Sequence, residues 1–319
     1  MLTEIIRLYE KRTDVTLTTY LINENGELSH QGNRPAVLIC PGGGYMNCSD
    51  REAEPVALAF AAMGYHTFVL RYSTYNEGEN LPPDITKPLP PKKRCQHPAP
   101  VHEIGQAMLI IHEHATQWYV DTARIAVCGF SAGAHNAAMY GIYWDKPMMT
   151  EYLNTEKEKI RPAALILGYT LSDYIYRNAS FEQSFGGKIF ESANIALLGS
   201  AHPDEKTCGS VSPARLVSAN TPPTFLWATS EDELVPVQHS LRMAHALADH
   251  KIPFEIHIFE KGSHGLCLAA QATALSRAQI CPDAAKWVSL AECWLQKRFA
   301  LKLPEKSDFR KFLDSKGVD

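Results

Sequence analysis

The chain has 319 residues, of which 45% are apolar and 21% charged, an ordinary composition for a globular protein able to bury one large core. Its formal net charge of −4 gives no reason to expect nucleic acid or an anionic membrane as a partner. The first residues lack a basic segment followed by an apolar one, and no apolar run approaches about 18 residues, so we expect neither a secretory signal nor a membrane span. The 8 cysteines are scattered without a Cys-x-x-Cys pair, which favours a reducing, cytoplasmic location.

The first part of the chain predicts the beginning of a parallel sheet. Residues 15–22 alternate apolar side chains with threonines, a pattern typical of a half-buried strand, and a turn is expected over 23–26. A continuous apolar run at 36–40 predicts a strand buried on both faces. A glycine loop follows this strand, then a helix over 52–63 and another buried strand over 67–70. This order is a βαβ unit, which implies parallel strands.

The segment from about 72 to 100 is rich in proline and shows no periodic pattern. We interpret it as a long loop, and because it follows a strand we expect it to run over the edge of the sheet that carries the active site. Residues 101–118 have helical periodicity, and 120–122 are expected to turn the chain into the next strand.

That next strand carries the most informative motif. An apolar run at 125–128 leads directly into Gly129-x-Ser131-x-Gly133, and a helical, alanine-rich segment follows. This is the sequence form of a nucleophile elbow, in which a serine occupies a strained turn between strand and helix. The glycines are expected there because the turn brings the two backbones too close for side chains.

The second half of the chain continues the alternation of strands and helices. Strands are expected over 163–167, 224–228 and 254–259, and helices over 236–249 and 282–299.

Two segments of the second half differ from this alternation. Residues from about 170 to 215 are irregular and aromatic-rich, and we interpret them as a cap inserted above the sheet, because so short a segment makes a poor core alone. The charged tail over 301–319 is expected to form a loosely docked helix. The prediction is therefore one α/β domain over 1–319.

A serine hydroxyl needs a base within hydrogen-bond reach, and the base needs an orienting carboxylate. In elbow-containing folds the acid and then the histidine follow the nucleophile, each in a loop after a strand. Asp232 follows the strand at 224–228, and His264 follows the strand at 254–259, in a loop with flanking glycines. We therefore predict Ser131, Asp232 and His264 as the catalytic residues.

Other acidic residues are also candidates for the catalytic acid. Asp173 also follows a strand, and Glu231 and Glu233 adjoin Asp232. We favour Asp232 because the next helix is expected to begin at Pro236, which keeps the loop short, and Asp173 is the alternative acid.

The oxyanion of a tetrahedral intermediate needs fixed donors. In this architecture they are the amide after the nucleophile, here Ala132, and amides of the glycine loop after an earlier strand, here Gly43 and Gly44. A phosphate-binding role for this loop is disfavoured, because it lacks both the Gly-Lys-Ser/Thr ending of a P-loop and the glycine spacing of a dinucleotide site.

Three tyrosines are predicted to line the substrate pocket: Tyr45, Tyr72 and Tyr169. The His-Glu-His run at 112–114 is not a convincing metal site, because residues two apart on a helix point to different faces. His135 follows the elbow and is interpreted as structural. We expect no metal and no cofactor.

Four motifs, in this order along the chain, give it a resemblance to the α/β-hydrolase superfamily over about residues 34 to 300. They are Pro41–Tyr45, Gly129–Gly133, Asp232-x-x-Val235-Pro236 and His264-Gly265. Within it the chain resembles the bacterial acetyl-esterase and xylan-esterase-like group, related to hormone-sensitive-lipase-type esterases. Those lipase relatives have His-Gly-Gly-Gly, where this chain has proline in place of the histidine.

The resemblance implies an eight-stranded, mostly parallel sheet flanked by helices. It also implies cofactor-free hydrolysis of short-chain esters, acetyl esters above all, through an acyl-enzyme. It further implies small-molecule ester substrates such as acetylated sugars, and a homodimer. Amide hydrolysis by a peptidase or formamidase on the same fold is the alternative, since both reactions share a tetrahedral intermediate. A non-catalytic binding module is disfavoured, because all three predicted catalytic residues are present.

Overall fold

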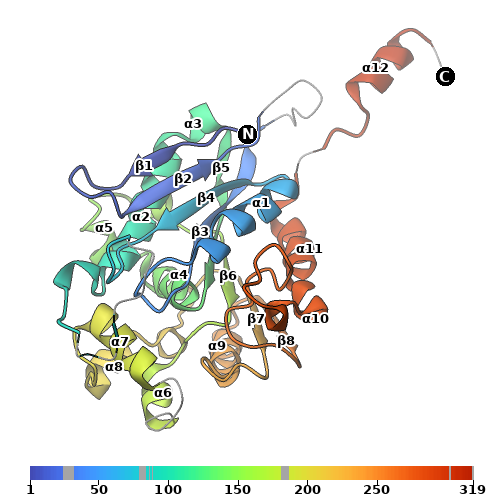
Figure 1. Ribbon diagram of the computed structural model, residues 1–319. Helices are drawn as coiled ribbons and strands as arrows, with labels where there is room; N and C mark the ends of the chain where they lie inside the picture. The colour runs from blue at the N-terminus through green and yellow to red at the C-terminus, as the bar shows by residue number, and fades with distance from the viewer. Residues whose placement is uncertain are drawn as a thin grey trace.

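The computed structural model describes residues 1–23, 32–78, 84–85, 87, 89–180, 187–301 and 303–317 (Figure 1). Most of the turn predicted over 23–26 lies outside the described residues, as do parts of the proline-rich loop and of the cap.

A single eight-stranded sheet organises the fold, with strand order β1-β2-β4-β3-β5-β6-β7-β8. The pairs β1–β2 and β2–β4 are antiparallel, and all the others are parallel. The predicted eight-stranded, mostly parallel sheet is therefore confirmed. The strands are β1 (Ile5–Arg7), β2 (Thr16–Tyr20), β3 (Arg34–Cys40), β4 (His66–Arg71), β5 (Val120–Phe130), β6 (Ala164–Gly168), β7 (Thr224–Thr229) and β8 (Phe254–Phe259).

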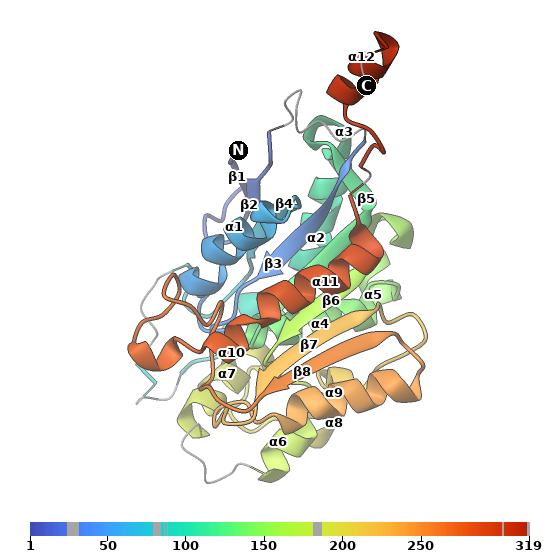
Figure 2. The ribbon, with the colours of Figure 1, turned by 90° about the vertical axis from the view of Figure 1, so that its right-hand side faces the viewer.

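Helices cover both faces of the sheet, as Figure 2 shows from the side. Successive residues of β3 point into different cores: Leu38 and Cys40 belong to one, Val37 and Ile39 to the other. The first core is closed by α2 (Ala99–Glu113), α4 (Ala132–Tyr143) and α9 (Gln238–Asp249), and the second by α1 (Glu54–Ala62) and α11 (Trp287–Phe299). The remaining α-helices are α3 (Ala115–Trp118), α5 (Pro147–Thr150), α6 (Tyr174–Ser180), α7 (Gly187–Leu198), α8 (Glu205–Ser210), α10 (Pro282–Ala285) and α12 (Asp308–Ser315).

Several predicted elements differ in detail from those observed. The helix expected over 52–63 is divided into the 3₁₀ turn η1 (Asp50–Glu52) and α1, which has a proline in its first turn. The residues expected to turn the chain at 120–122 belong to β5, because Val120 pairs with Arg34 of β3. The strand over 15–22 was predicted to be half-buried, but four of the five residues of β2 are buried.

The segment predicted to form a cap, at about 170–215, lies between β6 and β7. It contains α6, α7 and α8, which gather near the carboxyl ends of the parallel strands (Figure 1). The tail forms α12, which projects away from the rest of the chain in both views, with Phe309 and Phe312 exposed. Among the described residues, no helix is long and apolar enough to cross a membrane.

Candidate active site

Ser131 occupies the turn between β5 and α4 with a φ of 50°, in the left-handed region that most side chains avoid. Close backbone contacts around it require glycine. A Cβ on Gly129 would lie 2.3 Å from the carbonyl oxygen of Gly133, and a Cβ on Gly133 would lie 2.0 Å from that of Cys40. The Ser131 N–H donates to Gly168 O of β6 at 3.0 Å. The turn is thus fixed by both neighbouring strands.

The structure brings the three predicted catalytic side chains into one hydrogen-bonded chain. Ser131 Oγ lies 2.8 Å from His264 Nε2, and His264 Nδ1 lies 2.7 Å from Asp232 Oδ2. The other oxygen of Asp232 accepts from the N–H groups of Leu234 at 3.0 Å and Val235 at 2.8 Å. The Asp232 side chain is 1% exposed and that of His264 is 15% exposed. This geometry allows His264 to take a proton from Ser131 while Asp232 fixes the ring.

The alternative acid, Asp173, has different partners. It caps α6 by accepting from the Tyr176 N–H at 2.9 Å, and it pairs with Arg215 at 2.9 Å and Arg242 at 3.5 Å. Burial alone would raise the pKa of Asp173, but these hydrogen bonds and cations lower it overall. Asp173 therefore stabilises the base of the cap and does not contact His264. Glu231, the neighbour of Asp232, pairs with Lys261 at the surface.

The glycine loop after β3 lies directly beside the elbow. A Cβ on Gly42 would lie 3.0 Å from Ser131 Cβ. Within the described residues, the N–H groups of Gly43, Gly44 and Ala132 have no protein acceptor. Backbone donors without a protein partner are the chemistry that an oxyanion needs.

The three tyrosines predicted to line the pocket do not face open space. Tyr45, Tyr72 and Tyr169 are 2%, 1% and 3% exposed. Their hydroxyls bond to His135 Nδ1 at 2.6 Å, Pro41 O at 2.7 Å and Glu52 Oε1 at 2.5 Å. They pack behind the loops of the site and hold them.

His135 is buried and structural, as predicted. Its Nδ1 bonds to Tyr45 and its Nε2 to Val211 O at 2.8 Å. Burial lowers the pKa of His135 to about 4, which keeps the ring neutral near pH 7.

The proline-rich loop runs beside the glycine loop. The N–H groups of Tyr75 and Asn76 both donate at 2.9 Å, to Tyr45 O and Met46 O respectively. The loop thereby supports the segment that carries the candidate oxyanion donors.

Two residues that sequence reasoning missed complete the site. Glu52 and Arg51, from η1, bond to the glycine loop and to the loop that carries His264. No local pattern marks them, since their partners lie far along the chain.

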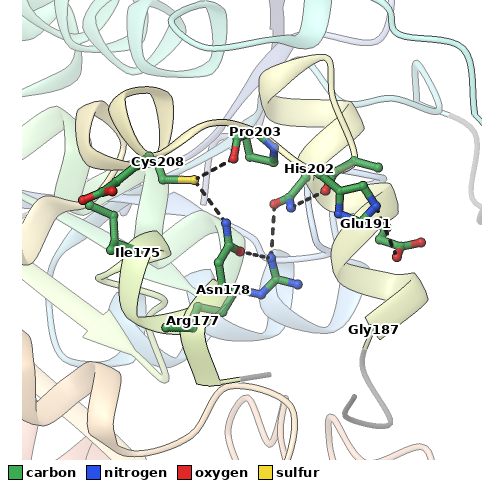
Figure 3. Close-up of a pocket in the computed structure, with 12 residues that line it drawn as sticks. Ile175, Arg177, Asn178, Gly187, Glu191, His202, Pro203 and Cys208 are labelled. Carbon is green, nitrogen blue, oxygen red and sulfur yellow. Dashed lines mark hydrogen bonds and ion pairs between the residues drawn. The ribbon is translucent and has the colours of Figure 1, made fainter. Parts of the chain in front are cut away.

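A separate pocket of about 650 Å³ lies inside the cap, between α6, α7 and α8 (Figure 3). Its polar lining is largely paired internally: Arg177 Nη1 bonds to Asn178, and His202 lies 3.9 Å from Glu191. None of Ser131, Asp232 and His264 lines it.

His114, in the His-Glu-His run at 112–114, stacks on Trp118. In the described part of the chain, no group of three His, Cys, Asp or Glu side chains could hold a metal ion.

An elbow serine linked to a histidine and a buried carboxylate, at the carboxyl edge of an eight-stranded mostly parallel sheet, defines the class of α/β hydrolases. The profile of the BD-FAE family matches residues 91–247. The chain is also 32% identical to MGS-M1, an α/β hydrolase from a deep-sea metagenome of the Medee basin, with a TM-score of 0.68, covering 95% of this chain and 99% of that one.

Two further relatives resemble the chain. An acetyl ester-xyloside bifunctional hydrolase from Caldicellulosiruptor lactoaceticus is 29% identical with a TM-score of 0.70, covering 93% of this chain and 97% of that one. Endo-1,4-beta-xylanase B of Butyrivibrio fibrisolvens is 32% identical over 238 residues, which are 74% of this chain and 33% of that protein.

The chain belongs to the α/β-hydrolase superfamily, as the sequence motifs predicted, and is similar to members of the acetyl-esterase and xylan-esterase-like group. Several of its relatives are named as esterases or ester hydrolases, in agreement with the predicted class of enzyme. The chain spans between 33% and 47% of the length of the three curated relatives it matches.

Proposed function

We propose that this protein is a serine carboxylesterase that hydrolyses short-chain acyl esters, preferably acetyl esters, through an acyl-enzyme intermediate. The observation that carries the proposal is the continuous chain of hydrogen bonds from Ser131 Oγ through His264 to the buried Asp232.

In the first half of the reaction, Ser131 Oγ attacks the ester carbonyl while His264 Nε2 removes the hydroxyl proton. Asp232 holds the Nδ1–H of His264, which fixes the tautomer and stabilises the imidazolium. His264 then returns the proton to the departing alcohol, leaving the acyl group on Ser131. In the second half, His264 activates a water that attacks the acyl carbonyl, and Ser131 is released.

The negative oxygen that forms in each half is bound, in this proposal, by the N–H groups of Ala132, Gly43 and Gly44. Ala132 directly follows Ser131, and Gly43 and Gly44 follow Gly42, on which a Cβ would lie 3.0 Å from Ser131 Cβ. These positions, and the lack of other acceptors within the described residues, support this role. Loss of one such donor typically lowers kcat by about 10²–10³-fold.

Acetylated sugars are the proposed natural substrates. Support comes from the acetyl ester-xyloside hydrolase and the xylanase among the relatives, whose names combine ester and xyloside chemistry.

The test compares wild type with Ser131→Ala on p-nitrophenyl acetate, with Ser289→Ala of the exposed face of α11 as the matched control. We expect Ser131→Ala to lose at least about 10³-fold in kcat and Ser289→Ala to match wild type. Equal rates for wild type and Ser131→Ala would overturn the proposal.

A substrate panel then tests specificity. We expect rates to fall from acetyl to butyryl to octanoyl esters, and acetylated xylose to be cleaved in preference to a peptide anilide or N-formylkynurenine. Faster cleavage of the anilide or of N-formylkynurenine would replace the esterase with an amide hydrolase.

We further propose that residues 1–319 form one hydrolase domain with a cap insertion at about 170–215, and that the protein works as a cytoplasmic homodimer. All 8 cysteines are free thiols, which supports a reducing compartment. A monomer mass by light scattering would rule out the dimer.

A further inference from the structure

The short turn η1 contacts both loops that carry the proposed chemistry, and Glu52 is its last residue. Glu52 Oε2 accepts from the Gly42 N–H at 2.7 Å, and Oε1 accepts from the Tyr169 hydroxyl at 2.5 Å. Because both oxygens face donors, the carboxylate form satisfies both bonds. The side chain is buried and has no part in the proton transfers proposed above.

The bond to Gly42 orients the glycine loop. The next carbonyl, Gly42 O, accepts from the Ser49 N–H at 2.9 Å, and Gly43 O accepts from Met46 N at 2.9 Å. In a planar trans peptide the N–H points away from its carbonyl, so these bonds turn the N–H groups of Gly43 and Gly44 away from residues 46–49. Glu52 is the charged side chain that holds the first peptide of this series.

The hydrogen bond between Glu52 and Tyr169 also links Glu52 to His264, because Tyr169 contacts the histidine ring. The Tyr169 ring meets the His264 ring edge-on, with centroids 5.0 Å apart and planes at 72°. The Tyr169 hydroxyl also accepts from the Cys267 N–H at 3.1 Å, in the loop that carries His264.

Arg51, the neighbour of Glu52, binds the same loop from its other side. Its Nη2 donates to Gly265 O at 2.9 Å, and its Nε donates to Thr273 O. The Cys267 thiol donates to Arg51 O at 2.8 Å. One turn of η1 therefore joins the glycine loop to the histidine loop.

We propose that Glu52 is a positioning residue for hydrolysis, which holds the oxyanion donors and His264 in register around Ser131. This inference rests on the proposed serine mechanism.

The energetics support a functional rather than a stabilising role. Burial raises the pKa of Glu52 above its usual value, while the bonds from Tyr169 and Gly42 and the nearby His264 and Arg51 oppose the rise. When the folded-state pKa of a carboxyl group is raised, the folded protein loses stability as the pH rises through that pKa. Ionisation of this buried carboxyl group therefore costs stability. Glu52→Gln keeps the size of the side chain but removes the charge and one acceptor.

The experiment compares wild type with Glu52→Gln, Tyr169→Phe and the double variant. Glu54→Gln, an exposed carboxylate in the first turn of α1, is the matched control. Two quantities are measured: kcat and KM for p-nitrophenyl acetate per titrated active site, and the rate at which a fluorophosphonate labels Ser131. The second requires the same geometry around Ser131 but no knowledge of the natural ester.

We expect Glu52→Gln to lower kcat and the labelling rate roughly 10- to 100-fold, with KM changed less than about threefold and the unfolding midpoint little changed. Tyr169→Phe should have a smaller effect, and the double variant should be no slower than Glu52→Gln, because both act through one bond. Glu54→Gln should match wild type.

The proposal is overturned if Glu52→Gln labels and turns over at the wild-type rate, or only unfolds more easily. Multiplicative losses in the double variant would likewise contradict a shared path. A wild type that neither labels at Ser131 nor hydrolyses the ester would instead defeat the serine mechanism itself, so the two failures are distinguishable.

Discussion

The loops that follow β6 and β7 invite comparison, because each carries a buried aspartate shortly after a central parallel strand. After β7, Asp232 accepts two backbone N–H groups and orients His264. After β6, Asp173 accepts one backbone N–H and pairs with two arginines.

The difference comes from the neighbours of each loop. β7 pairs directly with β8, so the loops after these two strands meet, and the histidine after β8 reaches the acid after β7. The loop after β6 instead leads into the cap, and Asp173 pairs there with Arg215 and with Arg242 of α9. Sequence context makes both aspartates candidates, and sheet order decides between them.

The largest effect on kcat is expected from a substitution of Asp232. Asp232→Asn keeps the shape of the side chain but removes the charge that stabilises the His264 imidazolium, so kcat should fall by roughly 10³–10⁴-fold. Steady-state kinetics with p-nitrophenyl acetate measures this. A loss of less than tenfold would mean that another group serves as the acid.

A third buried carboxylate extends the comparison to pH. Glu103 of α2 is 0% exposed and accepts from the Ser73 N–H at 2.6 Å and the Tyr9 hydroxyl at 3.1 Å. Burial raises the pKa of Glu103 to about 7, against the lowering effect of the Ser73 bonds and Arg12.

This folded-state pKa lies above the unfolded value near 4.5. The stability that the protonated Glu103 contributes is therefore fully present below pH 4.5 and is lost as the pH rises through 7. Ionisation of Glu103 should therefore lower the free energy of unfolding by up to about 3 kcal/mol between these limits. Denaturant unfolding at pH 5 and pH 8 measures the loss, and Glu103→Gln should flatten it. An equal pH dependence in wild type and Glu103→Gln would assign the change to other groups.

Asp173 is expected to affect stability and not chemistry. Asp173→Asn removes the one carboxylate that Arg215 and Arg242 share and should lower the free energy of unfolding by about 1–3 kcal/mol. Its lowered pKa contributes stability above the unfolded value of 3.8, which is lost as the pH falls. Urea unfolding measures the first effect. A fall in kcat comparable to that of Asp232→Asn, with stability unchanged, would reverse the assignment of the two loops.

The smallest effect on activity and stability is expected from removing the C-terminal tail, which lies far from both loops. α12 has no buried residue, so removing residues 303–319 should leave kcat, KM and the unfolding midpoint unchanged within error. A drop in kcat on truncation would show that the tail reaches the site.

Much of this fold follows from local patterns. Buried parallel strands such as β3 and β7 read as continuous apolar runs, and the elbow glycines follow from the close approach of β5 to α4. β1 was not predicted, because three residues with little burial carry no detectable period.

The supporting residues of the site could not be predicted. Glu52 is 117 positions from Tyr169, and Arg51 is 214 positions from Gly265. The three tyrosines are near the site as expected, but the sequence does not reveal that their hydroxyls are engaged within the protein.

The central claim, that Ser131 forms an acyl-enzyme with His264 as the base, is tested most directly by trapping the intermediate. Wild type mixed with p-nitrophenyl acetate and quenched with acid within milliseconds should carry one acetyl group, located by peptide mass spectrometry on Ser131. Ser131→Ala should carry none and should not turn over. Acetyl on another residue, or turnover by Ser131→Ala at the wild-type rate, would contradict the account.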